Sequence, residues 1–251
     1  MFEHEQELTG GNASERVVRK GNTVRKPWLE NSATVQAYLG ALRAAGVDVP
    51  TPLGRDGEGR HVVEFVEGKS ALEQLPLGHE DLMRVGRMIR QIHDASKSFA
   101  MPDPDGWNVL LPVEHPDLMC HNDLAPWNLI MGDRWVFIDW DGAGPSTRLW
   151  DLAYAAQSFG LLVDGQPVHE AALRLRAVVD GYGADIALRT ALPAAMAKRT
   201  AAMHDLLKSS HETGFQPWAD MYVAGHGEHW RGAADYVRQN LPVWDQALTA
   251  P

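Results

Sequence analysis

Residues 120–141 read CHNDLAPWNLIMGDRWVFIDWD, and this stretch decides the fold around it. It contains a polar loop with Asp123 and Asn128, a short apolar run, a turn at Gly132-Asp133, and a second apolar run that ends on Asp139. Apolar runs that flank a tight glycine-containing turn favour a β-hairpin. Because an antiparallel hairpin brings its two ends together, we expect the acids before and after it to face one cleft.

The residue types in this stretch suit phosphoryl transfer. Carboxylates and a carboxamide that converge on a cleft fit a hard cation such as Mg²⁺, which takes oxygen ligands and keeps part of its water shell for a phosphate. A further carboxylate can accept the proton of an attacking hydroxyl, and a cation then completes the set that phosphoryl transfer uses. Each acid alone would indicate only a turn or a helix cap. Their combination around a hairpin indicates a catalytic site.

The pattern His121-x-Asp123-x-x-x-x-Asn128, followed by Ile138-Asp139-Trp140, resembles the aminoglycoside phosphotransferase and choline kinase branch of the protein-kinase-like fold. Residues 137–141 (FIDWD) and 149–153 (LWDLA) are especially similar to the bacterial phosphotransferase enzyme family. The chain departs from the family pattern at Asn122, where a glycine usually separates the histidine from the aspartate. Asparagine tolerates left-handed backbone angles better than other non-glycine residues.

This resemblance implies an α+β, two-lobed protein-kinase-like fold, with a small, mostly antiparallel β amino-terminal lobe and a larger, mainly helical carboxy-terminal lobe. It also implies phosphoryl transfer from ATP or GTP, with Mg²⁺ as cofactor. Asp123 is expected to be the catalytic base, and Asn128 and Asp139 are expected to bind the metal. Asp151 is expected to anchor the catalytic loop through a hydrogen bond.

Two short strands are predicted near the amino terminus, at residues 16–19 and 23–26, with a turn at Gly21-Asn22 between them. By the resemblance they belong to the amino-terminal lobe. Gly10-Gly11-Asn12 would then take the place of the glycine-rich loop over the nucleotide. The segment contains no GxGxxG pattern, so a plain hairpin turn is the alternative interpretation.

In the family, a lysine on a strand of this lobe holds the nucleotide phosphates, and Lys26 is the predicted counterpart here. Val24 and Lys26 share a strand face by the two-residue period, which matches an inward valine and a lysine aimed at the cleft. Arg25 is the alternative, because a one-residue change of register would exchange the two cations.

A helix is predicted over residues 32–43. In the wider kinase fold this helix supplies a glutamate that pairs with the lysine. The matching position here lies near Val35, which is not acidic, so Glu30 and Gln36 are the alternative partners.

A strand predicted at residues 61–66 leads to Gly68, where the lobes are expected to join. Residues 1–68 would form the nucleotide-binding lobe, and residues 69–251 the catalytic and substrate-binding lobe. By the resemblance, backbone groups near Glu64 and Val66 contact the nucleotide base. Backbone contacts of this kind leave ATP and GTP as equal alternatives.

Helical periodicity predicts a mostly helical second half of the chain. Helices are predicted over residues 79–97, 152–162, 168–182, 186–211 and 217–248. Pro193 lies inside the fourth of these and predicts a kink or a new helix start. In the family these helices shape the acceptor pocket, often with acidic residues for the amines of aminoglycosides.

The composition is that of an ordinary globular protein, because 45% of the 251 residues are hydrophobic and 22% are charged. The formal net charge of −10 argues against nucleic acid as a partner, since phosphate backbones need a basic surface. It is compatible with a cationic small-molecule substrate. Cys120 is the single cysteine, which excludes an intramolecular disulfide. No apolar run reaches membrane-spanning length and the start is acidic and polar, so we expect a cytoplasmic protein without a membrane partner.

Two functional hypotheses result. The first is an ATP- and Mg²⁺-dependent phosphotransferase that acts on a hydroxyl of a small molecule, with an antibiotic such as an aminoglycoside as the first substrate class by resemblance. The second is a non-catalytic or specialised immunity protein that binds a peptide toxin, since trifolitoxin-immunity-like proteins resemble this compact family. The missing glutamate partner of the lysine and the absent GxGxxG pattern motivate the second hypothesis, whereas the intact Asp123, Asn128 and Asp139 favour the first.

Overall fold

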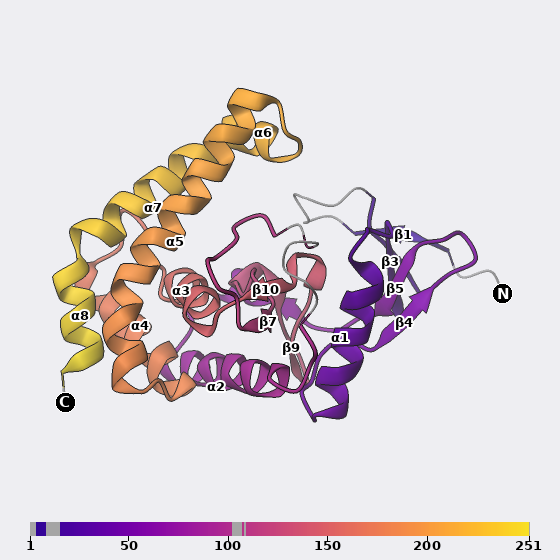
Figure 1. Cartoon of the computed structure of the whole chain (residues 1–251), viewed down its shortest axis with the longest axis horizontal. Coiled ribbons are helices and arrows are strands. Elements are labelled where there is room, and N and C mark those ends of the chain that lie inside the picture. The colour runs from indigo at the N-terminus through magenta and orange to yellow at the C-terminus, as the bar shows by residue number, and fades with distance from the viewer. Residues whose placement is uncertain (1–3, 9–15, 102–106, 108, 251) are drawn as a thin grey trace.

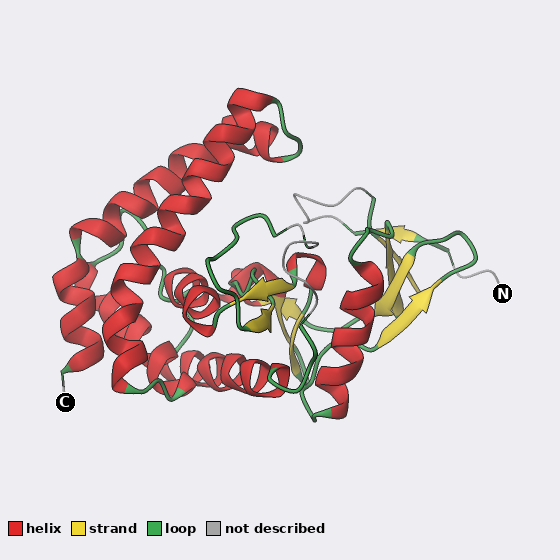
Figure 2. Ribbon diagram, viewed as in Figure 1, coloured by secondary structure: helices red, strands yellow, loops and turns green. Residues whose placement is uncertain are grey.

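The computed structural model describes residues 4–8, 16–101, 107 and 109–250. Strands gather in the part of the molecule that contains the amino terminus, and long helices form the carboxy-terminal part (Figure 1, Figure 2). This agrees with the predicted α+β division into a small antiparallel β part and a larger helical part. The predicted loop at Gly10-Gly11-Asn12 lies outside the described residues.

The amino-terminal part is built on a five-stranded antiparallel sheet with the order β1-β2-β3-β5-β4. Its strands are β1 (Gln6–Glu7), β2 (Val18–Lys20), β3 (Thr23–Lys26), β4 (Pro52–Arg55) and β5 (His61–Glu64). Gly21 supplies the left-handed backbone of the β2–β3 turn, with a φ of 57°. β3 has the predicted bounds, whereas β2 begins at Val18 rather than residue 16, and β5 ends at Glu64 rather than Val66.

The register of β3 and β5 decides which side chains share a face of this sheet. Lys26 pairs with His61, and Val24 pairs with Val63. Because residues two apart on a strand point to the same side, these four side chains lie on one face. Arg25 lies on the opposite face.

Helix α1 (Ser32–Ala44) follows β3 and docks on the same sheet. Val35 lies on its buried side and belongs to the main core. Gln36 fastens the helix to the strands, since its side chain accepts a hydrogen bond from the Gly54 amide at 2.9 Å and donates one to the Val62 carbonyl oxygen at 2.9 Å.

The chain then passes to the carboxy-terminal part, where β6 (Lys69–Ser70), β8 (Leu129–Met131) and β9 (Trp135–Phe137) form a three-stranded sheet in the order β6-β8-β9. Gly68 approaches β8 too closely for a side chain, because an added Cβ would lie 2.7 Å from Ile130 Cγ2 and 2.8 Å from the Met131 carbonyl oxygen. Gly68 thus lies where the chain changes sheets. The division of the lobes at this residue remains a proposal.

The β8–β9 pair is the hairpin expected from the sequence. Met131 pairs with Trp135 across the turn. Beyond the strands, the Ile138 amide donates to the Asn128 carbonyl oxygen at 2.8 Å. The two ends of the hairpin are therefore neighbours. β7 (Leu118–Cys120) and β10 (Gly144–Ser146) form a second antiparallel pair that brackets the same loops.

Helices form the remainder of the carboxy-terminal part. They are α2 (His79–Ser96), α3 (Arg148–Phe159), α4 (Val168–Tyr182), α5 (Ile186–Thr213), α6 (Trp218–Met221), α7 (Gly227–Gln239) and α8 (Leu241–Thr249). α5 and α7 run side by side and carry α6 at their far end (Figure 1). A new helix does not start at Pro193, because α5 is a single helix through that residue. In the part of the chain that the structure describes, every helix is too short or too polar to cross a bilayer.

Candidate active site

The loop that follows β7 carries His121 and Asp123, and its shape is set by the buried imidazole of His121. The Nε2–H of this ring donates to the Ile138 carbonyl oxygen at 3.1 Å. Nδ1 is therefore the acceptor for the Asp123 amide, at 3.2 Å. His121 thus joins the loop before the hairpin to the end of the strand after it.

Asn122 adopts the left-handed backbone expected at a glycine position, with a φ of 66°. Its side-chain Nδ2 donates to the carbonyl oxygens of Gly142, at 3.1 Å, and Gly144, at 3.4 Å. Its backbone N–H donates to Asp151 Oδ1 at 2.9 Å, and its carbonyl oxygen accepts from Arg199 of α5 at 3.2 Å. The departure from the family pattern therefore adds hydrogen bonds to the loop.

Asp123 presents its carboxylate beside Asn128 and Trp127. Oδ2 accepts from Asn128 Nδ2 at 2.7 Å and from Trp127 Nε1 at 3.4 Å. Burial raises the pKa of Asp123, and the Asp139 charge acts in the same direction against the opposing influence of His121. A raised pKa makes the carboxylate a stronger base, as the acceptor of a hydroxyl proton requires.

Asn128 and Asp139 supply oxygen donors at the open end of the hairpin, opposite its turn. Asn128 Nδ2 is committed to the Asp123 carboxylate and to the Asp123 carbonyl oxygen at 3.0 Å. Its Oδ1 is thus the atom that can bind a cation. Asp139 has a left-handed backbone with a φ of 59°, and its side chain is 42% exposed. Such a pair of hard oxygen donors, one of them charged and open to solvent, fits Mg²⁺.

Lys26 reaches this site from β3, in the other sheet. Its Nζ lies 2.7 Å from Asp141 Oδ1 and 3.0 Å from Asp139 Oδ1, and its side chain is only 8% exposed. Burial disfavours the ammonium, but the two carboxylates outweigh burial and raise the pKa of Lys26. Burial likewise opposes ionisation of Asp139, yet Lys26 lowers its pKa. Burial and the Asp139 charge raise the pKa of Asp141.

The alternatives to Lys26 and to its expected glutamate partner lie elsewhere. Arg25 contacts Asp56 Oδ2 through Nε at 3.2 Å, on the opposite face of the sheet. Gln36 is used to hold α1 against β4 and β5. Glu30 is exposed, and among the described residues Lys26 forms ion pairs with the two aspartates alone.

The expected anchor, Asp151, is fully buried and organises a directional chain of hydrogen bonds. Its Oδ1 holds the Asn122 amide, and its Oδ2 accepts from His93 Nε2 at 3.0 Å. His93 Nδ1 is then the acceptor for the Tyr182 hydroxyl at 3.0 Å, and that hydroxyl accepts from Arg148 at 3.0 Å. This chain ties the catalytic loop to α2 and α4.

The segment after β5 places Glu64 and Val66 differently. The Glu64 amide donates to the Thr51 carbonyl oxygen, and its carboxylate accepts from the Thr51 hydroxyl at 2.7 Å and pairs with Arg134. The Phe65 amide likewise donates a hydrogen bond to the Asn22 carbonyl oxygen. Val66 is buried, and no hydrogen bond of its amide occurs among the described residues. Glu64 and Val66 are the two residues predicted to contact the nucleotide base, and they belong to the segment that joins the two sheets, residues 64–68 (the hinge segment). Of these two, Val66 is therefore the one with a backbone donor left for a nucleotide base.

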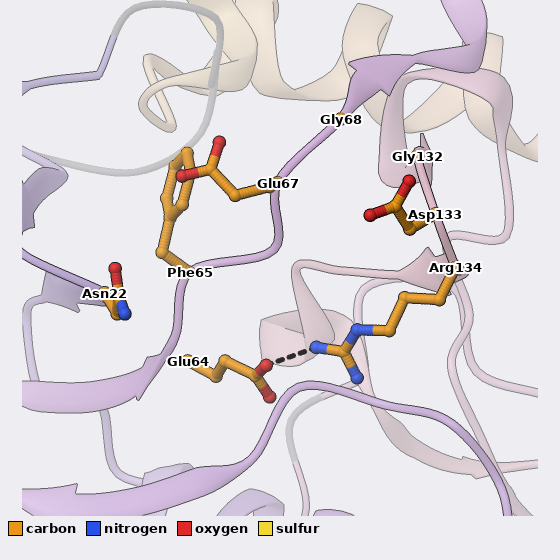
Figure 3. Close-up of a pocket in the computed structure, with 8 residues that line it drawn as sticks. All are labelled: Asn22, Glu64, Phe65, Glu67, Gly68, Gly132, Asp133 and Arg134. Carbon is orange, nitrogen blue, oxygen red and sulfur yellow. Dashed lines mark hydrogen bonds and ion pairs between the residues drawn. The ribbon is translucent and has the colours of Figure 1, made fainter.

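The Glu64–Arg134 pair lies at a cavity of about 560 Å³ between the hinge segment and the β8–β9 turn (Figure 3). The cavity is lined by Asn22, Glu64, Phe65, Glu67, Gly68, Gly132, Asp133 and Arg134. In Figure 3 the Arg134 side chain reaches across to Glu64. The Glu64 side chain is therefore part of a contact between the two sheets.

Sequence reasoning expected the acids after the hairpin, Asp141 among them, to face the cleft but assigned Asp141 no partner, and it missed two further neighbours of the site, His61 and Arg199. Asp141, two residues after Asp139, binds Lys26, and its spacing was a usable signal. His61 is buried opposite Lys26 in the register, and Arg199 is buried 4.2 Å from the Tyr154 ring centroid. Neither has a local signal, because β5 and α5 reach the site only through the tertiary fold.

Comparisons with known proteins agree with this geometry. The sequence model described as the phosphotransferase enzyme family matches residues 104–188. The trifolitoxin immunity protein of Rhizobium leguminosarum bv. trifolii is 30% identical, and the match covers 84% of this chain and 85% of that protein.

Solved structures with the same fold include kinases of small molecules. A choline/ethanolamine kinase family protein from Mesorhizobium loti superposes with a TM-score of 0.64 at 17% identity, over 99% of this chain and 93% of that one. An amicoumacin kinase in complex with AMP-PNP, Ca²⁺ and Ami gives a TM-score of 0.67 at 14% identity, over 94% of this chain and 88% of that one. These likenesses confirm the predicted kinase-like fold.

Proposed function

We propose a reaction for this chain, which belongs to the phosphotransferase enzyme family and is a small-molecule kinase. The protein transfers the terminal phosphoryl group of ATP or GTP to a hydroxyl of its substrate with the help of Mg²⁺. A hydroxylated antibiotic is the substrate class to test first, with aminoglycosides among the candidates. The cytoplasm, where the nucleotide is available, is the proposed location.

The contact that carries this proposal is the one between Lys26 and Asp139 at 3.0 Å. These residues lie 113 positions apart; Lys26 ends β3 of one sheet, and Asp139 follows β9 of the other. The contact places two groups that phosphoryl transfer requires side by side. The lysine ammonium can bind the phosphates, and the solvent-exposed carboxylate can bind the metal. Asp123 and Asn128, hydrogen-bonded at 2.7 Å, add the base and the second metal ligand to the same site.

Each residue has a distinct task in this mechanism. Asp123 accepts the proton of the acceptor hydroxyl, and Asn128 and Trp127 hold its carboxylate in position. Asn128 Oδ1 and the Asp139 carboxylate would hold Mg²⁺, and the bound ion would neutralise charge on the transferred group. Lys26 contributes a fixed positive charge for the phosphates. The chemistry rests on positioning and charge stabilisation.

The base is tested with Asp123→Ala. The wild-type protein and the variant are each incubated with radiolabelled ATP, Mg²⁺ and a panel of hydroxylated antibiotics, and the products are separated by chromatography. We expect transfer in the variant to fall about 10²-fold to 10⁴-fold, the usual contribution of a general base, while Mg²⁺–ADP still raises its Tm.

Asp245→Ala is the matched control, because Asp245 is an exposed acid on α8, away from the site. It should keep wild-type activity. Undiminished transfer by Asp123→Ala would contradict the role assigned to Asp123.

A second candidate function is protection against a peptide toxin, favoured by the 30% identity to the trifolitoxin immunity protein. The two candidates differ in whether protection needs catalysis. Wild-type protein and Asp123→Ala are expressed in a trifolitoxin-sensitive host, and survival is scored. Protection that persists in the variant, with no phosphoryl transfer to any acceptor, would favour binding. Loss of protection in Asp123→Ala would indicate that protection depends on phosphoryl transfer.

A further inference from the structure

We propose that Asp141 positions Lys26 in the nucleotide site, in place of the glutamate that the helix α1 lacks. The proposal rests on the proposed function of this site as a nucleotide site. Helix α1 presents the buried Val35 where the acid is expected, and its Gln36 is used by β4 and β5. Lys26 nonetheless has an acidic partner, because Asp141, which follows β9 of the other sheet, takes that place.

The two carboxylates around Lys26 differ in distance and exposure. Asp141 Oδ1 lies at 2.7 Å from Nζ, and its side chain is 19% exposed. Asp139 Oδ1 lies at 3.0 Å, and its side chain is 42% exposed. Asp141 is therefore the closer and more enclosed partner, whereas Asp139 is the one that an incoming cation can reach.

Asp141 is held in place by the amino-terminal end of α1. The Asn31 side chain, at the N-cap position, donates through Nδ2 to the Asp141 carbonyl oxygen at 2.9 Å. Asp141 also lies within a short 3₁₀ segment, Trp140–Gly142, which limits its backbone freedom. The start of α1 thus acts on Lys26 indirectly, by fixing the acid that binds it.

One cation is shared by two carboxylates in this arrangement. Asp139 and Asp141 repel each other, and Lys26 offsets this repulsion. Among the described lysines and arginines, it alone forms an ion pair with either carboxylate. A metal bound to Asp139 would relieve that repulsion and leave Lys26 to Asp141. Asp141 would then keep the ammonium extended toward the phosphates while Asp139 serves the metal.

Binding of ADP in the presence of EDTA tests this role without catalysis or metal. Isothermal titration calorimetry is run on the wild type, Asp141→Asn and Asp141→Glu. We expect Asp141→Asn to weaken metal-free ADP binding about tenfold or more, the usual effect of losing a charged hydrogen-bond partner. Asp141→Glu should recover part of the loss. Asp180→Asn removes a carboxylate that pairs with Arg189 on α5 at 2.7 Å and should bind ADP as the wild type does.

A second measurement follows Lys26 itself and needs no nucleotide. Acetylation by acetic anhydride is quantified by mass spectrometry for Lys26, with the exposed Lys208 as internal reference. Loss of Asp141 removes a charge that stabilises the ammonium, so Lys26 should react about 2-fold faster or more in Asp141→Asn.

The outcomes separate the inference from the proposed function. Unchanged ADP affinity and unchanged Lys26 reactivity in Asp141→Asn would overturn the positioning role. Absence of ADP binding by the wild type, together with faster acetylation in Asp141→Asn, would overturn the nucleotide site and leave the Asp141–Lys26 pair supported.

Discussion

His61 is a histidine in a setting that removes its usual charge. It is buried on β5, its Nδ1 lies 4.0 Å from Asp141 Oδ1, and neither ring nitrogen has a hydrogen-bond partner among the described residues. Burial, followed by the charge of Lys26, lowers the pKa of His61 from 6.5 to about 4, against the opposing pull of Asp139. The ring is therefore neutral near pH 7, so Lys26 is the cation of the Lys26–His61 strand pair.

This shift makes stability depend on pH with a defined sign. Below its ordinary value of 6.5 the histidine takes up a proton in the unfolded chain, but in the folded protein it does so only near pH 4. The unfolded state thus binds more protons across this window, and folding stability falls as the pH falls from about 6.5 to about 4. Urea unfolding of the wild type and His61→Leu, at about pH 7 and about pH 5, measures the effect.

The wild type should lose more stability than His61→Leu between the two pH values. Comparing the losses of the two proteins cancels the titration of the other groups, which both proteins share. Equal losses in the two proteins would show that His61 takes up its proton in the folded state as readily as in the unfolded one.

At the scale of elements, helices α2 and α4 cross with their backbones in close contact. A Cβ on Gly86 of α2 would lie 2.1 Å from the Val178 carbonyl oxygen, and a Cβ on Gly181 of α4 would lie 2.1 Å from the Met83 carbonyl oxygen. The two backbones therefore touch at both glycines. Because His93 and Tyr182 belong to these helices, the crossing also supports the hydrogen-bond chain that holds the catalytic loop.

Gly86→Ala should lower the free energy of unfolding by at least about 1–3 kcal/mol, because backbone atoms cannot move aside for the new methyl group. Gly40→Ala is the control on α1, since a Cβ there meets nothing within 4 Å. In that helix interior alanine should stabilise the protein by up to about 1 kcal/mol. Urea unfolding of both variants gives the comparison, and a Gly86→Ala protein as stable as the wild type would contradict the close crossing.

At the scale of the whole molecule, Arg134 links the two sheets beside the cavity in Figure 3. It belongs to the β8–β9 turn and pairs with Asp48, at 2.5 Å, and with Glu64, both in the amino-terminal part. Its side chain is 36% exposed, so the pairs contribute little to stability. Their effect lies in holding one part of the molecule in a fixed orientation to the other.

Arg134→Ala should therefore change the free energy of unfolding by less than about 1 kcal/mol. Binding of Mg²⁺–ADP should nevertheless weaken about 2-fold to 5-fold, because the two parts must be ordered when the nucleotide binds. Calorimetry and urea unfolding measure the two quantities. Arg176→Ala is the control, since Arg176 pairs with Asp180 within α4 and its side chain is 39% exposed. Equal nucleotide affinity in both variants would contradict an orienting role.

The sequence by itself determined the family, the α+β division and the β8–β9 hairpin. These follow from local patterns: an apolar run, a glycine turn and a second apolar run favour the Met131–Trp135 pairing. The bounds of β3 and α4 were also predicted, because Pro27 ends the strand and Gly183, with a φ of 68°, ends the helix.

The tertiary structure alone decided how the cations and acids pair. The choice of Lys26 over Arg25 depends on the register of β3 with β5, and the choice of Asp141 over a residue of α1 depends on how the two sheets face each other. His61 and Arg199 enter the site from elements distant in sequence. Hydrogen bonds and ion pairs depend on distances of a few ångströms between such elements, and periodicity within one element carries no information about those distances.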